Sequence, residues 1–163
     1  MKRIGVISDT HGTIHPRVFS FFSDCNEIWH AGDIGNIETY DRLQKFKPIR
    51  AVYGNIDGGV LRQELNEYEF FSVEGLKVVM IHIGGYPGRY SQKGRELVDK
   101  YKPGLFISGH SHILKVIPDR KNNLLHINPG ACGNSGLHNH ITLIRFIIKS
   151  ENITDLEVFE IKR

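Results

Sequence analysis

The 163-residue sequence predicts an α/β domain with two β-sheets and helices on their faces. In the first half of the chain, short apolar segments alternate with helical patterns, which is typical of βαβ units. From Tyr68 onward, pairs of apolar segments joined by tight turns indicate a second sheet. The length fits one domain, 40% of the residues are hydrophobic, and there is no internal repeat or linker. We therefore predict a single domain over residues 1–163.

The first half is expected to contain three strands and two helices. Apolar segments predict strands over residues 3–8, 27–30 and 49–53. Apolar side chains at helical spacing predict one helix through Val18 and Phe22 and another over residues 37–46, which Lys47-Pro48 ends.

The second half is expected to begin with a hairpin and to continue mainly as strands. Residues 69–73 and 77–81 flank the turn signal Glu74-Gly75-Leu76. A helix over 91–101 ends at Lys102-Pro103-Gly104 and leads into an apolar strand at 105–107. The remaining predicted strands are 113–117, 124–128, 141–149 and 153–161.

Composition excludes several classes of protein. The net charge of +3, from 21 basic and 18 acidic residues, comes without a charged run, so no nucleic-acid surface is indicated, whereas a small anionic substrate is compatible. No apolar segment approaches the roughly 20 residues that span a bilayer, and the first apolar run stops at Asp9, too early for a signal peptide. Cys25 and Cys132 cannot form a disulfide framework. We expect a cytoplasmic protein without a membrane partner, and a homo-oligomer is left open.

Four short polar strings follow apolar segments and carry the functional signal. The string Gly109-His-Ser-His112 places two imidazoles two residues apart, although by itself such a pair is more often a solvated loop. Asp9-Thr-His11, Gly32-Asp33 and Gly54-Asn55 each follow another predicted strand. Because strand ends line the ligand crevice of an open α/β sheet, the four strings are expected to converge on one site.

The candidate donors are three oxygen side chains and four imidazoles, which is enough for two metal ions that share a ligand. The absence of thiolates disfavours a structural zinc and suits Mn²⁺, Fe²⁺, Zn²⁺ or Ni²⁺. Two such ions, roughly 3.5 to 4 Å apart, can hold a bridging hydroxide for in-line displacement at phosphorus. Asp33 stands alone in its loop and is the better candidate for the shared ligand. The full set is Asp9, His11, Asp33, Asn55, His82, His110 and His112.

In order, SDTHG, AGD, GNID, a histidine after the segment ending at Ile81, and SGHSH resemble the calcineurin-like metallophosphoesterases, and the short length is similar to the YfcE-type phosphodiesterases. The resemblance implies a four-layered α/β/β/α sandwich of two mixed sheets flanked by helices. It implies hydrolysis of a small phosphate ester by in-line attack of a hydroxide bridging two divalent ions, most commonly Mn²⁺, with Ni²⁺, Fe²⁺, Zn²⁺ and Mg²⁺ as alternatives. It implies that Asp9, His11 and His112 bind one ion, that Asn55, His82 and His110 bind the other, and that Asp33 bridges; Asp33, Asn55 and His82 are the expected catalytic residues.

Two positions depart from the family pattern. Ile56 stands where many members have a histidine that assists the leaving group, which favours diesters or aryl esters over alkyl monoesters. Ile83 separates His82 from Gly84, where the family more often has His-Gly directly, so the loop could be shifted.

Several histidines and one arginine have two interpretations. Arg89, in the glycine-rich loop after His82, could bind a phosphate, but a solvated loop arginine is the more common case. His30 could orient a ligand or could be a plain core histidine. The other histidines are expected to be exposed (His15) or strand-like, with little chance of touching substrate (His126, His138 and His140).

Two other functions compete with a phosphodiesterase. A phosphomonoesterase or a nucleotide-specific hydrolase of the same fold would use the same residues, although the lack of a basic track disfavours long polymers. A non-catalytic scaffold like the retromer subunit with this fold would have a degraded metal site, and the seven intact positions argue against it.

Overall fold

The computed structural model describes residues 1–163 and contains two five-stranded sheets and a two-stranded hairpin. The first sheet has the order β12-β11-β1-β2-β3, in which β1, β2 and β3 run parallel and β11 and β12 antiparallel to their neighbours. Its strands are β1 (Lys2–Ile7), β2 (Glu27–His30), β3 (Ile49–Ala51), β11 (His140–Lys149) and β12 (Asn152–Lys162).

The second sheet has the order β4-β5-β8-β10-β9, with β5, β8 and β10 parallel and the two outer strands antiparallel. Its strands are β4 (Tyr68–Val73), β5 (Leu76–Ile81), β8 (Leu105–Ile107), β9 (Leu114–Asp119) and β10 (Leu124–Pro129). The separate hairpin is β6 (Gly85–Tyr86) with β7 (Arg89–Tyr90). Both large sheets are therefore mixed, as predicted.

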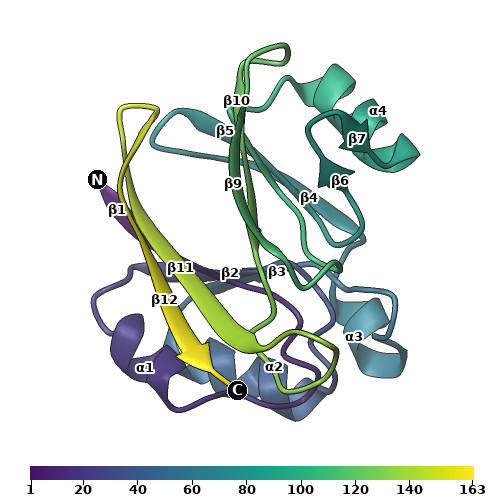
Figure 1. Cartoon of the computed structure of the whole chain (residues 1–163), viewed down its shortest axis with the longest axis vertical. Helices are drawn as coiled ribbons and strands as arrows, with labels where there is room; N and C mark the ends of the chain where they lie inside the picture. The colour runs from purple at the N-terminus through teal and green to yellow at the C-terminus, as the bar shows by residue number, and fades with distance from the viewer.

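Helices cover the outer faces of the two sheets, so the layers run helix, sheet, sheet, helix (Figure 1). The helices α1 (Arg17–Phe21) and α2 (Ile37–Phe46) cover the first sheet, and α4 (Gln92–Tyr101) covers the second. The short α3 (Gly59–Glu64) packs Leu61 beside the β3 edge. The predicted α/β class with two mixed sheets is confirmed.

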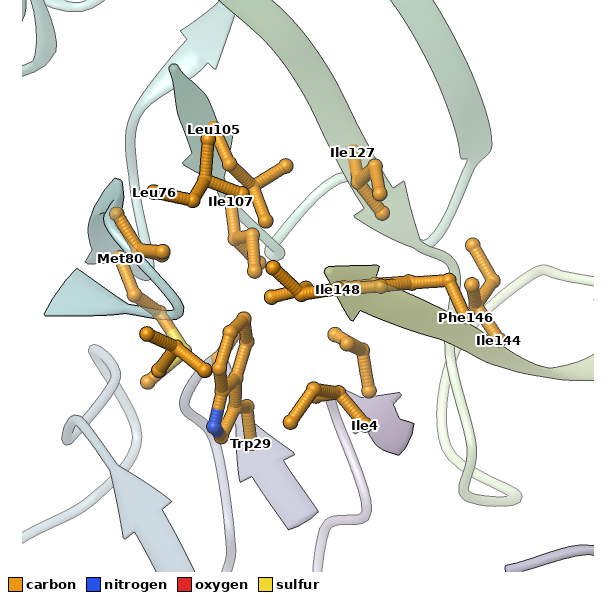
Figure 2. Packing of buried hydrophobic residues seen from close by; sticks show 14 of the residues in the cluster. Ile4, Trp29, Leu76, Met80, Leu105, Ile107, Ile127, Ile144, Phe146 and Ile148 are labelled. Atoms are coloured by element: carbon orange, nitrogen blue, oxygen red, sulfur yellow. The ribbon is translucent and has the colours of Figure 1, made fainter. Parts of the chain in front are cut away.

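Buried apolar residues form four clusters, of which the one beside α3 and the β3 edge is the smallest. Strand alternation explains the division in β5, where Val78 and Met80 face the first sheet and Val79 and Ile81 face α4. The central cluster packs Trp29 of the first sheet against the second sheet (Figure 2). Its 15 buried residues make the largest core of the protein and fix the two sheets face to face.

The structure differs from the sequence predictions in its shortest elements. Neither α3 nor the β6–β7 hairpin was expected, because six and two residues are too few to show a helical or strand period. Strand β3 ends at Ala51 rather than at residue 53, and Val52 forms only an isolated bridge with Asn66. His138 lies in a loop and not in a strand-like segment. No helix has the length and apolar character needed to cross a membrane.

We expect the protein to lose stability in mild acid because of His126. Its ring is fully buried, Nδ1 lies 3.1 Å from the Phe106 carbonyl oxygen, and Nε2 has no partner. Burial lowers the pKa of His126 to about 4, and nearby Lys115 acts in the same direction while Phe106 and Asp119 oppose it. In the unfolded chain His126 takes up a proton near pH 6.5, whereas in the folded protein it stays neutral down to about pH 4. The free energy of unfolding therefore begins to fall near pH 6.5 and is about 3 kcal/mol lower near pH 4.

Urea unfolding at pH 7.5 and at pH 5 measures this effect. His126→Gln should lose less stability between the two pH values than wild type, whereas the exposed His140→Gln should behave like wild type. An equal loss in wild type and His126→Gln would show that other groups cause the acid sensitivity.

Candidate metal centre

The sequence-predicted donors all follow strand ends at the same edge of the molecule. Asp9 and His11 follow β1, Asp33 follows β2, and Asn55 lies in the loop after β3. In the second sheet, His82 follows β5, and His110 and His112 follow β8. Within each sheet these strands run parallel to one another, so their carboxyl ends bring the donors together.

Six of the seven predicted ligands form two compact groups. One contains Asp9, His11 and His112, and the other contains Asp33, His82 and His110; within each group the candidate ligand atoms lie within 4.8 Å of one another. The imidazoles of each group meet edge to face, with ring centroids 5.5 Å apart for His11 and His112 and 5.3 Å apart for His82 and His110. The histidines divide between the groups as the sequence predicts, whereas Asp33 falls in the second group and Asn55 in neither. The division of ligands between two ions stays a prediction.

Asp33 lies between the two groups. Its Oδ2 is 3.2 Å from His82 Nε2 in its own group and 3.5 Å from His11 Nε2 in the other. Its Oδ1 accepts a hydrogen bond from the Ile56 amide at 3.0 Å. Asp9 Oδ1 also approaches His82, but at 3.8 Å, and Asp9 Oδ2 is used by Ser8 and the His110 amide. Asp33 therefore has the better position for a shared ligand.

Asn55 and Arg89 lie at the rim. Asn55 is exposed and lines a cavity together with His82, and its neighbour Gly54 packs against Asp33 so closely that a Cβ at that position would meet the carboxylate. Arg89 is also exposed and lines a different cavity, which borders His110. Both side chains are exposed, unlike the buried Asp9, Asp33 and His82.

Three buried ligand atoms lack any hydrogen-bond partner, namely Asp9 Oδ1, His11 Nε2 and His82 Nε2. Because His82 Nδ1 donates to the Ala31 carbonyl at 2.7 Å, its Nε2 carries a free lone pair. Orphaned buried lone pairs are rare in proteins, and a cation satisfies oxygen and imidazole donors together. The residues therefore fit divalent metal ions.

Electrostatics keep the carboxylates ionised. Burial opposes ionisation of Asp9, but His112, whose Nε2 lies 3.2 Å from Asp9 Oδ1, the charge of His82 and the Ser8 hydroxyl outweigh it and lower the pKa of Asp9. The pKa of Asp33 is lowered against its burial by His82 and the Ile56 amide. Conversely, Asp33 and Asp9 raise the pKa of His82 despite its burial. The cluster thus attracts positive charge, whether a proton or a metal ion.

Five of these donors have a left-handed backbone. The φ angles are 55° at Asp9, 49° at His11, 55° at Asp33, 70° at His110 and 61° at His112. Asp and His tolerate this region better than most residues, but each position still costs roughly 1–3 kcal/mol. Strain of this kind persists where surrounding structure holds it, and its concentration on the predicted ligands supports a functional site.

Asp57 and His30 fix the loops that carry the donors. The buried Asp57 carboxylate accepts backbone hydrogen bonds from Ile34, Gly35 and Gly54, so it joins the Asp33 loop to the Asn55 loop. His30 accepts from the Gly32 amide and lies 3.0 Å from Thr10 Oγ1, which links the Asp33 loop to the Asp9 loop. Asp57 was missed from sequence, although it ends the GNID string.

His138, which the sequence did not single out as a site residue, contacts a predicted ligand. Its Nδ1 lies 3.2 Å from His112 Nδ1, and its Nε2 lies 2.8 Å from the Gly133 carbonyl oxygen. If His138 Nε2 donates to Gly133, then His138 Nδ1 accepts from His112, and His112 Nε2 is left free for a metal. Burial lowers the pKa of His138, which favours this neutral form.

We expect His138→Ala to weaken metal binding by about 10- to 100-fold at the Asp9 group, because loss of an outer hydrogen-bond partner misorients the ligand. Isothermal titration of metal-free protein measures the two affinities. His140→Ala removes an exposed imidazole that lies two residues further along the chain and 3.5 Å from Glu160, and it should bind metal like wild type. If wild type, His138→Ala and His140→Ala bind metal with equal affinity, His138 does not orient His112 for metal binding.

Comparison with known proteins agrees with this geometry. Residues 1–151 match the calcineurin-like phosphoesterase superfamily domain. A probable metallophosphoesterase of Methanothermobacter thermautotrophicus is 33% identical over 137 residues, which cover 78% of this chain and 76% of that protein.

Solved structures show the same fold. Vps29 of Chaetomium thermophilum has a TM-score of 0.77 at 14% identity, with 99% of this chain and 97% of that chain covered. A novel archaeal phosphodiesterase has a TM-score of 0.72 at 21% identity, with 99% of each chain covered. At these identities the structural likeness supports the fold alone, whereas the sequence matches and the candidate ligand groups support a phosphoesterase. The chain belongs to the calcineurin-like phosphoesterase superfamily.

Proposed function

We propose that the protein is a metal-dependent phosphodiesterase that hydrolyses a small phosphate ester at a dinuclear centre, with Mn²⁺ as the first metal to test. The observation that carries this proposal is the position of Asp33 Oδ2 within 3.5 Å of an imidazole from each ligand group. Two divalent cations would supply positive charge for activating a water nucleophile and for stabilising the phosphoryl oxygens.

The chain's own residues would hold and orient the reacting groups. Asp9, His11 and His112 would hold one ion and His82, His110 and Asn55 the other, and Asp33 would be shared between them. The Ile56 amide fixes Asp33 through Oδ1 and leaves Oδ2 for the centre. Asn55 lines the cavity beside His82, and its carboxamide would contact substrate there.

Preference for diesters with good leaving groups follows from Ile56. Ile56 follows Asn55, is 47% exposed, and its amide donates to Asp33, so this position offers an alkyl group and not an imidazole beside the proposed centre. General acid assistance contributes roughly 10²–10⁴ in rate when the leaving oxygen is basic. Without it, an aryl oxygen that leaves unaided is favoured over an alkyl oxygen.

The test compares kcat/KM for bis(p-nitrophenyl) phosphate and for an alkyl phosphate monoester on Mn²⁺-loaded protein. We expect the aryl diester to be the far better substrate. Ile56→His should raise alkyl-ester cleavage more than aryl-ester cleavage, and Ile56→Leu should leave the ratio unchanged. If Ile56→His leaves the ratio unchanged at full metal loading, Ile56 does not set the preference.

The same experiment tests the two competing functions. Faster cleavage of alkyl monoesters than of diesters would favour a phosphomonoesterase. A protein that binds no metal and cleaves neither substrate would favour the scaffold role. The two intact ligand groups favour the enzyme.

A further inference from the structure

Two cavities border the second ligand group, one beside His110 and one beside His82. The first has a volume of about 200 Å³ and the second about 250 Å³. Ile83, the residue that departs from the family pattern, is 44% exposed and lines both cavities. A phosphodiester has two organic arms, and the centre therefore offers a separate space for each.

The cavity beside His110, which we call the basic cavity, contains Arg89, Lys115, Tyr86 and Ser111. No carboxylate lines it, and neither Arg89 nor Lys115 is paired with an acidic group. Lys115 Nζ lies 4.0 Å from the centroid of the Tyr86 ring, which supports the ammonium group without neutralising it. Two unneutralised cations in one small cavity favour an anionic occupant.

Ser111 adds a hydrogen-bond donor to the basic cavity. Its Oγ accepts from Asn128 Nδ2 at 3.1 Å and from the Ile113 amide at 3.2 Å. Because the oxygen already accepts two bonds, its hydroxyl proton remains for a ligand. Guanidinium, ammonium and hydroxyl donors together suit a phosphate group.

The hairpin that carries Arg89 is held in place. Pro87-Gly88 forms its turn, with φ 86° at Gly88, as a type II turn requires. Ser108 Oγ donates to the Gly85 carbonyl at 2.9 Å, and the Tyr90 hydroxyl donates to Asp119 at 2.6 Å. The backbone at Arg89 is thus fixed to the second sheet, and little order must be gained when a ligand binds.

The cavity beside His82 has a different character. Arg62 donates to the Asp57 carbonyl at 2.6 Å and covers the Tyr53 ring at 4.5 Å, and Glu67 supplies a negative charge. The positive charge of Arg62 is balanced by the negative charge of Glu67, and the Arg62 guanidinium already donates a hydrogen bond within the protein. This cavity suits an uncharged arm, such as an aryl group.

We infer that the basic cavity binds a second phosphate on one arm of the substrate, so the substrate class is a phosphodiester with an additional phosphate group, as at a phosphorylated nucleotide end. This inference rests on the proposed function, because the reacting phosphate must lie at the ligand groups. The volume of about 200 Å³, that of roughly seven water molecules, accommodates one phosphate with part of its arm.

Binding tests the inference without turnover. Isothermal titration compares thymidine 3′,5′-bisphosphate with thymidine 5′-monophosphate on Mn²⁺-treated protein. We expect the bisphosphate to bind about tenfold more tightly or better, as one charge-assisted contact provides. The double variant Arg89→Ala, Lys115→Ala should lose this advantage, Arg89→Lys should keep part of it, and the exposed Lys121→Ala should keep all of it. Equal affinity for the two nucleotides in wild type would overturn the inference.

Turnover separates failure of the inference from failure of the proposed function. Thymidine 5′-(p-nitrophenyl phosphate) and its 3′-phosphorylated derivative share the reacting group and differ by one phosphate. We expect the double variant to lower kcat/KM for the phosphorylated diester about tenfold more than for the unphosphorylated one. Cleavage of both diesters with equal losses would refute the basic cavity alone. Cleavage of neither diester would refute the proposed function, and the nucleotide affinities would then decide the inference.

Discussion

Replacing Asp33 by Asn is expected to remove both metal ions together and to lower phosphodiesterase activity by more than about 100-fold. Substitution of an outer partner already costs about 10- to 100-fold, and Asp33 lies within 3.5 Å of imidazoles from both ligand groups. The amide keeps the size of the side chain but loses the charge that offsets two cations. Metal analysis of the purified protein, together with kcat/KM for bis(p-nitrophenyl) phosphate, measures both effects.

His112→Ala provides the contrast, because His112 belongs only to the Asp9 group and should weaken chiefly one ion. Asp41→Asn makes the same chemical change on the exposed face of α2 and should leave metal content and activity unaltered. If Asp9→Asn releases both ions while Asp33→Asn releases none, Asp9 is the shared ligand.

Replacing Asp57 by Ala is expected to destabilise the fold by about 3 kcal/mol or more and to weaken metal binding as well. The substitution leaves three amide N–H groups without their acceptor, at Ile34, Gly35 and Gly54, and each such group costs about 1–3 kcal/mol. Because the same bonds join the Asp33 and Asn55 loops, the second ligand group should lose its geometry.

Urea unfolding and metal titration measure the two effects of Asp57→Ala. Asp57→Asn retains one acceptor oxygen and should lie between wild type and Asp57→Ala in stability. Asp41→Ala is the surface control. A variant Asp57→Ala with wild-type stability and wild-type metal affinity would mean that water replaces the carboxylate at no cost.

The sequence could predict that all seven donors lie at strand ends, because each donor follows an apolar run long enough to be recognised as a strand. The prediction that they converge adds only the general rule that strand ends line the ligand crevice. The α/β class with two sheets rests on the same pattern and is confirmed. Ligation itself stays a prediction.

Asp57 and His138 could not be predicted because their partners are distant in sequence and lie in loops. Asp57 acts on amides 22 and 23 residues before it, and His138 meets a histidine 26 residues before it. A backbone amide gives no sequence signal, and the loop around His138 has no period. The hairpin that carries Arg89 could not be predicted either, because strands of two residues are too short to show alternation of apolar and polar residues.

The donors come from both sheets, and this has a consequence for the stability of the whole molecule. Asp9, His11 and Asp33 belong to loops of the first sheet, whereas His82, His110 and His112 belong to loops of the second. A bound ion would therefore link the loops of one sheet to the loops of the other, at the edge where the apolar core ends. Free ion at 100 times its dissociation constant adds about 2.7 kcal/mol to the free energy of unfolding. The concentration of metal would therefore set how strongly the two sheets resist separation.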